Sequence, residues 1–335
     1  MPRISADRFR AMVNDVSVPD REIGELLIRS PDDNNRGKLR DITLVPDPDK
    51  VEVEPGKENA LAIGNGISRS RRQRRFRLAL NAGDKRPVLV SEGDSWFQFP
   101  FLIEDVIDHL GSDHLIWSMD AAGDTAENML GMNSEYIEGL RLWKDRPVRA
   151  FLLSAAGNDV IGADPAGVSM LSRLLRAHQP GQPARAHIDE AMLASVMSDL
   201  ESRYRETIVK VRAEPGLANL PILIHGYDHA LPSGFPGDRR RPIYADRDQW
   251  LGAPLHAHGI DKPELREAII RELIDKLYAM LQRVAGDPDQ TKVYLVDARD
   301  AIHRDQWNDE IHGTDDGFAA VAARFRNILR SALTT

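Results

Sequence analysis

Short apolar runs alternate with longer helical patterns through most of this chain, and this alternation constrains its fold more than any other feature. The runs are rich in Val, Ile and Leu. They show no clean alternation of apolar and polar residues, which is typical of strands buried on both faces. They predict strands over 87–91, 114–118, 148–154, 221–225 and 292–296.

Apolar residues with helical spacing fill the stretches between and after these runs. We expect helices over 101–110, 125–143, 165–178, 187–212, 262–284 and 316–333. Strands that alternate with helices form a parallel sheet with right-handed crossovers and helices on both faces. The sequence therefore predicts an α/β fold over 87–335, a three-layer α/β/α sandwich around a mostly parallel five-stranded sheet. The long linker 229–260 is rich in Pro, Gly and Arg and is interpreted as a lid or binding loop.

Residues 1–86 do not follow this pattern and are interpreted as an N-terminal accessory segment of unknown role. Short helices are expected over 6–13 and 22–29, with Ser5 and Asp20 as their N-caps. The polar stretch that follows them predicts loop with one hairpin.

An arginine-rich stretch over 68–77 allows two interpretations, a phosphate-binding patch or the solvated face of a helix. The formal net charge of the chain is −8, and few aromatic residues are interleaved with these arginines, so the solvated helix face is favoured. The same charge balance argues against a nucleic-acid partner.

No stretch approaches the roughly 20 apolar residues needed to cross a bilayer, and the first residues hold no apolar core of signal-peptide length. The chain contains no cysteine, which removes disulfides, Cys-ligated zinc, iron–sulfur clusters and thiol nucleophiles together. We therefore expect a cytoplasmic protein without a membrane span. Its oligomeric state is left open.

Four polar signatures follow predicted strands or precede the last predicted helix. They are Gly93-Asp94-Ser95 after the first strand, Gly123 after the second, Gly157-Asn158-Asp159 after the third, and Asp309-Glu310-Ile311-His312 before the last helix. Ligands of open α/β sheets bind at the carboxyl ends of the strands. These signatures can therefore converge on one site.

The residue types at this edge fit acyl transfer. Ser95 becomes a nucleophile if His312 takes its proton, and Asp309 can hold the other ring nitrogen of that histidine. The oxyanion needs fixed donors, and the candidates are the backbone N–H groups of Ser95 and Gly123 and the side-chain amide of Asn158. This chemistry requires neither a metal ion nor a cofactor.

The four signatures resemble the conserved blocks of the SGNH hydrolases, also called the GDSL esterase/lipase superfamily. Gly93-Asp94-Ser95-Trp96 is similar to the first block, with Trp where many members have Leu. The resemblance covers roughly residues 86–333 and implies an SGNH/flavodoxin-like fold and ester hydrolysis through a Ser95–His312–Asp309 triad. It further implies an oxyanion hole made by Ser95, Gly123 and Asn158.

The residues at the end of the fourth predicted strand resemble a subgroup of the superfamily. The stretch His225-Gly226-Tyr227-Asp228 and the ending His312-Gly313-Thr314 resemble a bacterial subgroup. The candidate substrate-binding residues are Trp96, Tyr227, Asp228 and Trp250. The aromatic residues Trp96, Phe97, Phe99, Phe101 and Trp250 either line an acyl- or ring-binding pocket or pack the core and the lid.

Three points stay open. Asp300-Ala301-Ile302-His303 also fits the Asp-x-x-His pattern, and we prefer Asp309 and His312 because they immediately precede the last helix. The substrate is a small-molecule, lipid or carbohydrate ester, or a thioester, since fold alone does not choose among them. A second hypothesis is a catalytically inactive binding or scaffold protein of the same fold.

Overall fold

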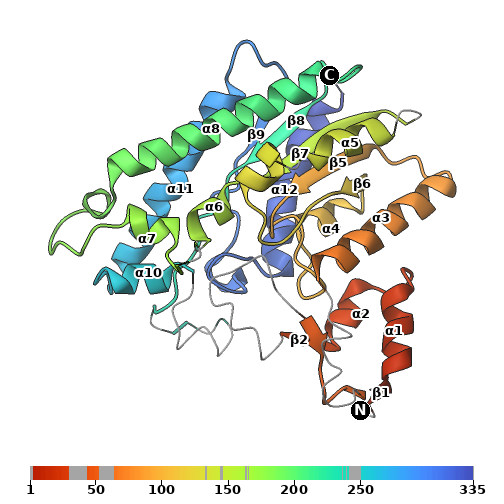
Figure 1. Ribbon diagram of the computed structural model, residues 1–335, viewed down its shortest axis with the longest axis horizontal. Coiled ribbons are helices and arrows are strands. Elements are labelled where there is room, and N and C mark those ends of the chain that lie inside the picture. The colour runs from red at the N-terminus through yellow and green to blue at the C-terminus, as the bar shows by residue number, and fades with distance from the viewer. Residues whose placement is uncertain are drawn as a thin grey trace.

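A five-stranded parallel sheet forms the centre of the molecule, which is described by a computed structural model (Figure 1). The structure describes residues 3–29, 44–52, 64–132, 134–143, 146–162, 164, 166–235, 237, 238, 240 and 250–334. The strands are β5 (Val88–Gly93), β6 (Leu115–Ser118), β7 (Val148–Ser154), β8 (Ile222–His225) and β9 (Val293–Val296). All five coincide with predicted strands, so the expected α/β fold is confirmed.

The strand order is β6-β5-β7-β8-β9, and every neighbouring pair is parallel. At the carboxyl edge, Gly93 pairs with Ser154, Ser154 with His225, and His225 with Val296. Because these strands end in register, the residues that directly follow them meet at one edge. The sequence signatures after β5 and β7 are thereby brought next to each other.

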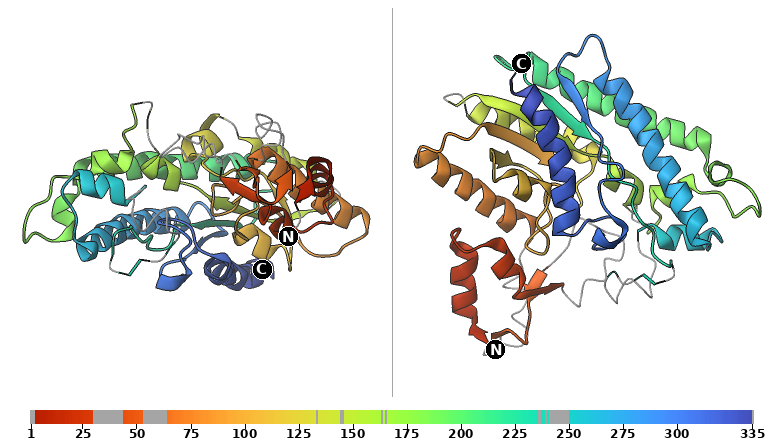
Figure 2. Two further views of the ribbon diagram at one scale, coloured as in Figure 1. Left: turned by 90° about the horizontal axis from the view of Figure 1, so that it is seen from below. Right: turned by 180° about the vertical axis from the view of Figure 1, so that it is seen from behind.

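Helices cover both faces of the sheet (Figures 1 and 2). They are α4 (Val106–Leu110), α5 (Glu135–Leu142), α6 (Gly157–Ile161), α7 (Met170–Leu174), α8 (Glu190–Ala213), α10 (Gly252–Ala257), α11 (Pro263–Ala285) and α12 (Asp315–Ala332). Short π- and 3₁₀-helical turns add η3 (Glu127–Met132), η4 (Ala184–His187) and η5 (Arg304–Gln306). Helix α4 packs against α12, and α8 packs beside α11. No helix in these described ranges is both long and apolar enough to cross a membrane.

The helix α3 (Asn65–Asn81) belongs to the predicted accessory segment, yet it packs directly against β6. Its Phe76 lies in the same buried cluster as the sheet and contacts Trp117 and Trp143 at ring-centroid distances of 5.4 and 4.7 Å. The arginine-rich stretch is therefore part of a helix that covers the sheet.

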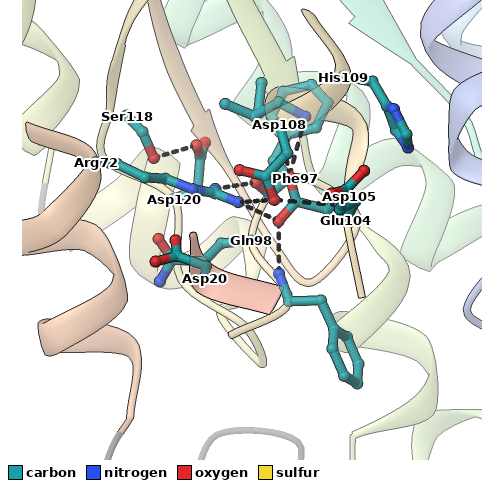
Figure 3. A network of polar contacts seen from close by, with 12 residues as sticks. Asp20, Arg72, Phe97, Gln98, Glu104, Asp105, Asp108, His109, Ser118 and Asp120 are labelled. Carbon is teal, nitrogen blue, oxygen red and sulfur yellow. Dashed lines mark hydrogen bonds and ion pairs between the residues drawn. The ribbon is translucent and has the colours of Figure 1, made fainter. Parts of the chain in front are cut away.

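Neither a phosphate-binding patch nor a solvated helix face accounts for Arg71 and Arg72. Both side chains are buried and bonded within the protein. Arg72 donates 2.5 and 2.7 Å bonds to the carboxylates of Asp105 and Asp108, and a 2.7 Å bond to the carbonyl of Phe97 (Figure 3). Asp105 also caps α4 through the backbone N–H groups of Ile107 and Asp108. The planar guanidinium can satisfy several acceptors at once, which makes its burial tolerable.

The remaining N-terminal elements are β1 (Ile4–Ser5), α1 (Ala6–Asn14), α2 (Asp20–Gly24), β2 (Leu27–Arg29), β3 (Leu44–Pro46) and β4 (Val51–Glu52). They enclose a small apolar cluster of their own, which Phe101 joins from the loop after β5. Ser5 caps α1 as predicted, by accepting a bond from the N–H of Arg8.

The prediction for 22–29 is wrong in its second half. Residues Leu27–Arg29 form β2, which pairs antiparallel with β3, because burial against the small cluster outweighs their helical spacing. Asp20 begins α2 and Pro19 occupies the N-cap position, so Asp20 is not the predicted N-cap. Its carboxylate instead accepts bonds from Arg71 and Arg75. The predicted hairpin falls mostly outside the described residues.

Candidate active site

Ser95 lies two residues past the end of β5, in a turn held by Asp94. The Asp94 carboxylate accepts bonds from the Trp96 backbone N–H (3.1 Å), from the Ser154 hydroxyl (3.0 Å) and from the Tyr227 hydroxyl (2.5 Å). A side chain at Gly93 would come within 2.6 Å of the Phe97 ring, so only glycine fits there. The turn therefore presents Ser95 at the carboxyl end of β5, and the Asp94 carboxylate holds the turn in place.

His312 and Asp309 lie directly against this serine. The ring atom Nε2 of His312 is 2.8 Å from Oγ of Ser95, and Nδ1 is 2.9 Å from both carboxylate oxygens of Asp309. Asp309 also accepts bonds from the backbone N–H groups of Ile311 and His312, which close a tight turn over these residues. All three side chains are buried, so their mutual geometry is shielded from water.

The surroundings of the imidazole fix its orientation further. Phe99 and Trp250 meet the ring edge-on, with centroid distances of 4.7 and 5.9 Å. The indole N–H of Trp96 donates a 3.0 Å bond to the carbonyl of Ile311, which joins the serine turn to the histidine turn. Burial alone would raise the pKa of Asp309, but the neighbouring His312 ring and the two backbone N–H groups lower it below its ordinary value.

The third signature, Gly157-Asn158-Asp159, follows β7 and is preceded by the strained residue Ala156. Ala156 has φ of +105°, a conformation that costs an L-residue roughly 1–3 kcal/mol and that recurs at functional sites. It directs the N–H of Gly157 to the Tyr227 hydroxyl, at 2.8 Å, while a side chain at Gly157 would collide with the Tyr227 ring. This close approach explains why position 157 is glycine.

Asn158 and Asp159 bind the loop that contains the second signature. The Asn158 amide donates a 2.6 Å bond to the carbonyl of Asp124, and the Asp159 carboxylate accepts the N–H of Ala126 at 2.7 Å. A primary amide has two N–H donors, so this bond leaves Asn158 a second one. Gly123 has φ of +81°, the left-handed region that glycine reaches without strain. The segments after β6 and β7 are thus tied together beside Ser95.

A cavity of about 90 Å³ opens beside the serine. Ser95, Trp96, Asn158 and Tyr227 line it near the strand ends. The rest of its wall is apolar apart from Asp94, and most of it comes from Val160, Ile161, Leu171, Leu174, Leu193, Met197, Leu200, Ile270, Leu273, Ile274 and Leu277. The site therefore combines a serine–imidazole–carboxylate array with an apolar compartment.

The residues suggested for substrate binding fall into two groups. Trp96 and Tyr227 line the cavity. Trp250 packs on His312 instead, and the Asp228 carboxylate accepts the backbone N–H groups of His229, Asp300 and Ile302. Asp228 and Trp250 are outside the cavity wall as far as the chain is described.

Other aromatic residues of the first signature have structural positions. Phe97 stacks on His225 in the main core, and Phe101 joins the N-terminal cluster. The rival pair Asp300 and His303 is exposed, and the structure connects Asp300 to His229 and Arg271.

Glu310 has a role that the sequence did not indicate. It is completely buried, and its carboxylate accepts the backbone N–H groups of Ser233, Leu251 and Gly252 at 2.8–3.0 Å. These bonds hold Ser233, Leu251 and Gly252 of the linker 229–260 against the turn that contains His312. A glutamate in a polar turn is ordinarily solvent-exposed, so no sequence signal distinguishes it.

One cluster in the described part of the chain has side chains of the types that bind metal ions. Ligand atoms of Asp228, His229 and Asp300 lie within 4.8 Å of one another. Arg271 already contributes a positive charge there, 2.8 Å from Nδ1 of His229, and backbone N–H groups occupy the Asp228 carboxylate. This arrangement is that of a partly exposed ion-pair network within the protein.

The sequence matches no protein-family model and no curated protein. Structural likeness extends to several solved chains. A Streptococcus pneumoniae protein provisionally named as a platelet activating factor shares 14% identity at a TM-score of 0.43, over 79% of this chain and 94% of its own. An acetyl xylan esterase from Butyrivibrio proteoclasticus shares 13% sequence identity at a TM-score of 0.38, and the match covers 74% of this chain and 64% of the esterase. The SGNH-hydrolase family esterase AlinE4 shares 16% sequence identity at a TM-score of 0.26, and the match covers 74% of this chain and 97% of AlinE4.

This chain therefore spans less than two thirds of the length of the xylan esterase. Identities and TM-scores at this level say nothing about which reaction this chain performs.

Proposed function

We propose that the chain is a serine hydrolase that cleaves a carboxylic ester or thioester through an acyl-enzyme intermediate. The observation that carries this proposal is the 2.8 Å contact between Oγ of Ser95 and Nε2 of His312, in an imidazole whose other nitrogen meets Asp309 at 2.9 Å. A serine hydroxyl needs such a neighbouring base to act as a nucleophile. The likeness of the four sequence signatures to SGNH hydrolases supports the same assignment.

In the proposed reaction, Oγ of Ser95 attacks the carbonyl carbon as its proton passes to Nε2 of His312. The carbonyl electron pair moves to the oxygen, where the backbone N–H of Ser95, the N–H of Gly123 and the Asn158 amide are the proposed donors. Collapse expels the alcohol or thiol, which takes the proton from His312. Water then attacks the acyl carbon as its proton passes to Nε2 of His312. His312 returns this proton to Oγ of Ser95 as the carboxylic acid leaves. Asp309 orients the ring and stabilises its charged form.

The decisive experiment compares Ser95→Ala with Ser112→Ala, a variant of an exposed serine. The rate of p-nitrophenyl acetate hydrolysis should fall about 10⁴-fold or more in Ser95→Ala and stay unchanged in Ser112→Ala. A fluorophosphonate probe should label the wild type and Ser112→Ala but not Ser95→Ala. Full activity in Ser95→Ala overturns the proposal. A native protein that neither hydrolyses esters nor reacts with the probe supports the inactive scaffold instead.

The two Asp-x-x-His pairs are distinguished by replacing their histidines. His312→Ala should lose activity about as completely as Ser95→Ala, because residues of such an array act as a unit. His303 is exposed, bonded through its backbone N–H to Gln306, so His303→Ala should hydrolyse esters at the wild-type rate. The reverse outcome reassigns the base to His303.

A further inference from the structure

The shape of the cavity beside Ser95 results from the difference in length between two helices and the strands they cover. Helix α8 has 24 residues and α11 has 23, so each is about 35 Å long, whereas β8 and β9 have four residues each and span about 13 Å. Both helices run antiparallel to the strands, and their N-terminal halves extend past the carboxyl edge of the sheet. Figure 1 shows these halves next to α7 and α10.

The overhanging halves carry apolar residues on their facing sides. Leu193, Met197 and Leu200 follow one another along one face of α8, at spacings of four and three residues. Helix α11 contributes Ile270, Leu273, Ile274 and Leu277 with the same periodicity, and α7 adds Leu171 and Leu174. With the sheet absent beneath them, these side chains enclose a space and do not cover a strand.

The polar atoms of this cavity are concentrated at its Ser95 end. Asp94 and Tyr227 bond to each other there, and Asn158 and Ser95 lie at the same end. Beyond them, the helices α7, α8 and α11, all of whose residues the structure describes, supply no charged or hydroxyl side chain to the wall. Cavities of this composition remain dry and take apolar ligands, whereas a sugar needs several convergent polar groups.

We propose that this cavity binds the straight hydrocarbon chain of an acyl group, so that the preferred substrates are esters or thioesters of medium- or long-chain fatty acids. The proposal rests on the serine hydrolase function above and names its substrate class. Assignment to the acyl side follows from the order of events. The alcohol leaves after the first step, whereas the acyl group stays bonded to Ser95 and needs an enclosed compartment until water arrives.

The first test measures kcat/KM for p-nitrophenyl esters of increasing acyl length. Each methylene that enters an apolar site contributes about 0.8 kcal/mol, which is about fourfold in kcat/KM. Octanoate should therefore exceed acetate at least tenfold. A parallel series of acetate esters with lengthening alcohols should show no such rise. A preference for acetate, or a rise only along the alcohol series, overturns the proposal and leaves the hydrolase function intact.

Variants that fill the cavity provide the second test. Met197→Trp on α8 and Leu273→Phe on α11 should each lower the ratio of octanoate to acetate kcat/KM at least tenfold. Val209→Trp is the matched control on α8, since Val209 is 54% exposed, and it should leave the ratio unchanged. Thermal unfolding checks that each variant is folded. An unchanged ratio in both folded filling variants contradicts the assignment of the cavity.

A third test does not depend on turnover. Decanoate should bind the Ser95→Ala protein in isothermal titration calorimetry, acetate should not, and Met197→Trp in the same background should weaken decanoate binding at least tenfold. Absence of decanoate binding overturns the proposal whether or not the native protein hydrolyses esters. Decanoate binding by a native protein that is inactive toward every ester retains the apolar site and rejects only the hydrolase function.

Discussion

The Tyr227 hydroxyl donates a 2.5 Å bond to the carboxylate of Asp94 and accepts the backbone N–H of Gly157 at 2.8 Å. It thereby links the residue before Ser95 with the residue before Asn158. Burial raises the pKa of Asp94, and the bond from Tyr227 counteracts part of that rise. Tyr227 is therefore a positioning residue that sets the spacing between the proposed nucleophile and a proposed oxyanion donor.

Tyr227→Phe should lower kcat about tenfold to hundredfold with little change in KM for p-nitrophenyl acetate. The substitution leaves the Gly157 N–H and the Asp94 carboxylate without this partner, so Asn158 loses its fixed distance from Ser95, and oxyanion donors act mainly in the transition state. The free energy of unfolding should also fall by about 1–3 kcal/mol. Steady-state kinetics and urea unfolding measure both effects.

Tyr294→Phe is the matched control, because Tyr294 lies on β9 and is only partly buried. It should match the wild type in kcat and KM. If Tyr227→Phe loses stability but retains kcat, the hydroxyl is structural only and the positioning role is rejected.

Arg72 connects helix α3 to the loop that follows Ser95, because it bonds to the buried carboxylate of Asp105 and to the carbonyl of Phe97. Arg72→Met should lower the free energy of unfolding by about 3–5 kcal/mol, because it leaves the Asp105 carboxylate buried without its counter-charge. Urea unfolding monitored by circular dichroism measures this loss.

Two further variants distinguish charge from packing at this position. Arg74→Met replaces an exposed arginine of the same helix and should cost less than about 0.5 kcal/mol. The double variant Arg72→Met, Asp105→Asn removes the unpaired charge and should recover part of the stability. A loss in Arg72→Met no greater than in Arg74→Met would show that the buried pair contributes nothing.

The sheet could be predicted because its strands have a strong local signal. Runs such as Val88–Val90 and Ile222–Ile224 are apolar and buried throughout, and β-branched residues favour extended backbone in such buried runs. The segment 22–29 shows the limit of this reasoning. Its spacing suits a helix, yet Leu27–Arg29 pair with Leu44–Pro46, and a long-range partner leaves no trace in a local pattern.

In the candidate site, too, the residues with a local sequence signal could be predicted and those that depend on long-range contacts could not. Ser95, Asn158 and His312 could be located because each follows a recognisable turn or strand end, and the structure brings Ser95 and His312 into contact. Glu310 and the cavity wall could not be located. Leu193 and Leu273 have the spacing of ordinary core residues, and only the overhang of their helices past the sheet edge places them around an empty space.

His225, at the end of β8, is fully buried between Phe97 and Phe325, with ring-centroid distances of 5.4 and 5.2 Å. Its Nδ1 lies 2.6 Å from the carbonyl of Gly226. Burial lowers the pKa of His225 from its ordinary 6.5 to about 4, and the Gly226 carbonyl offsets only part of this effect. The folded protein therefore holds this ring neutral at a pH where the unfolded chain binds a proton.

The sign of the resulting pH dependence follows from proton linkage. Between pH 6.5 and about 4 the unfolded state binds the additional proton, so this histidine destabilises the fold increasingly as the pH falls through that window. The total should be about 3 kcal/mol, reached near pH 4 and absent above about pH 7. His225→Phe keeps the aromatic packing and removes the titrating group. The Gly226 carbonyl retains its 2.8 Å bond from the Tyr278 hydroxyl.

The measurement is urea unfolding of the wild type and His225→Phe at intervals from pH 4 to pH 8. All other titrating groups are shared, so the difference between the two curves isolates His225. The variant should gain about 3 kcal/mol relative to the wild type between pH 7 and pH 4. If the His225→Phe curve runs parallel to that of the wild type, the ring titrates alike in both states and its burial does not control its charge.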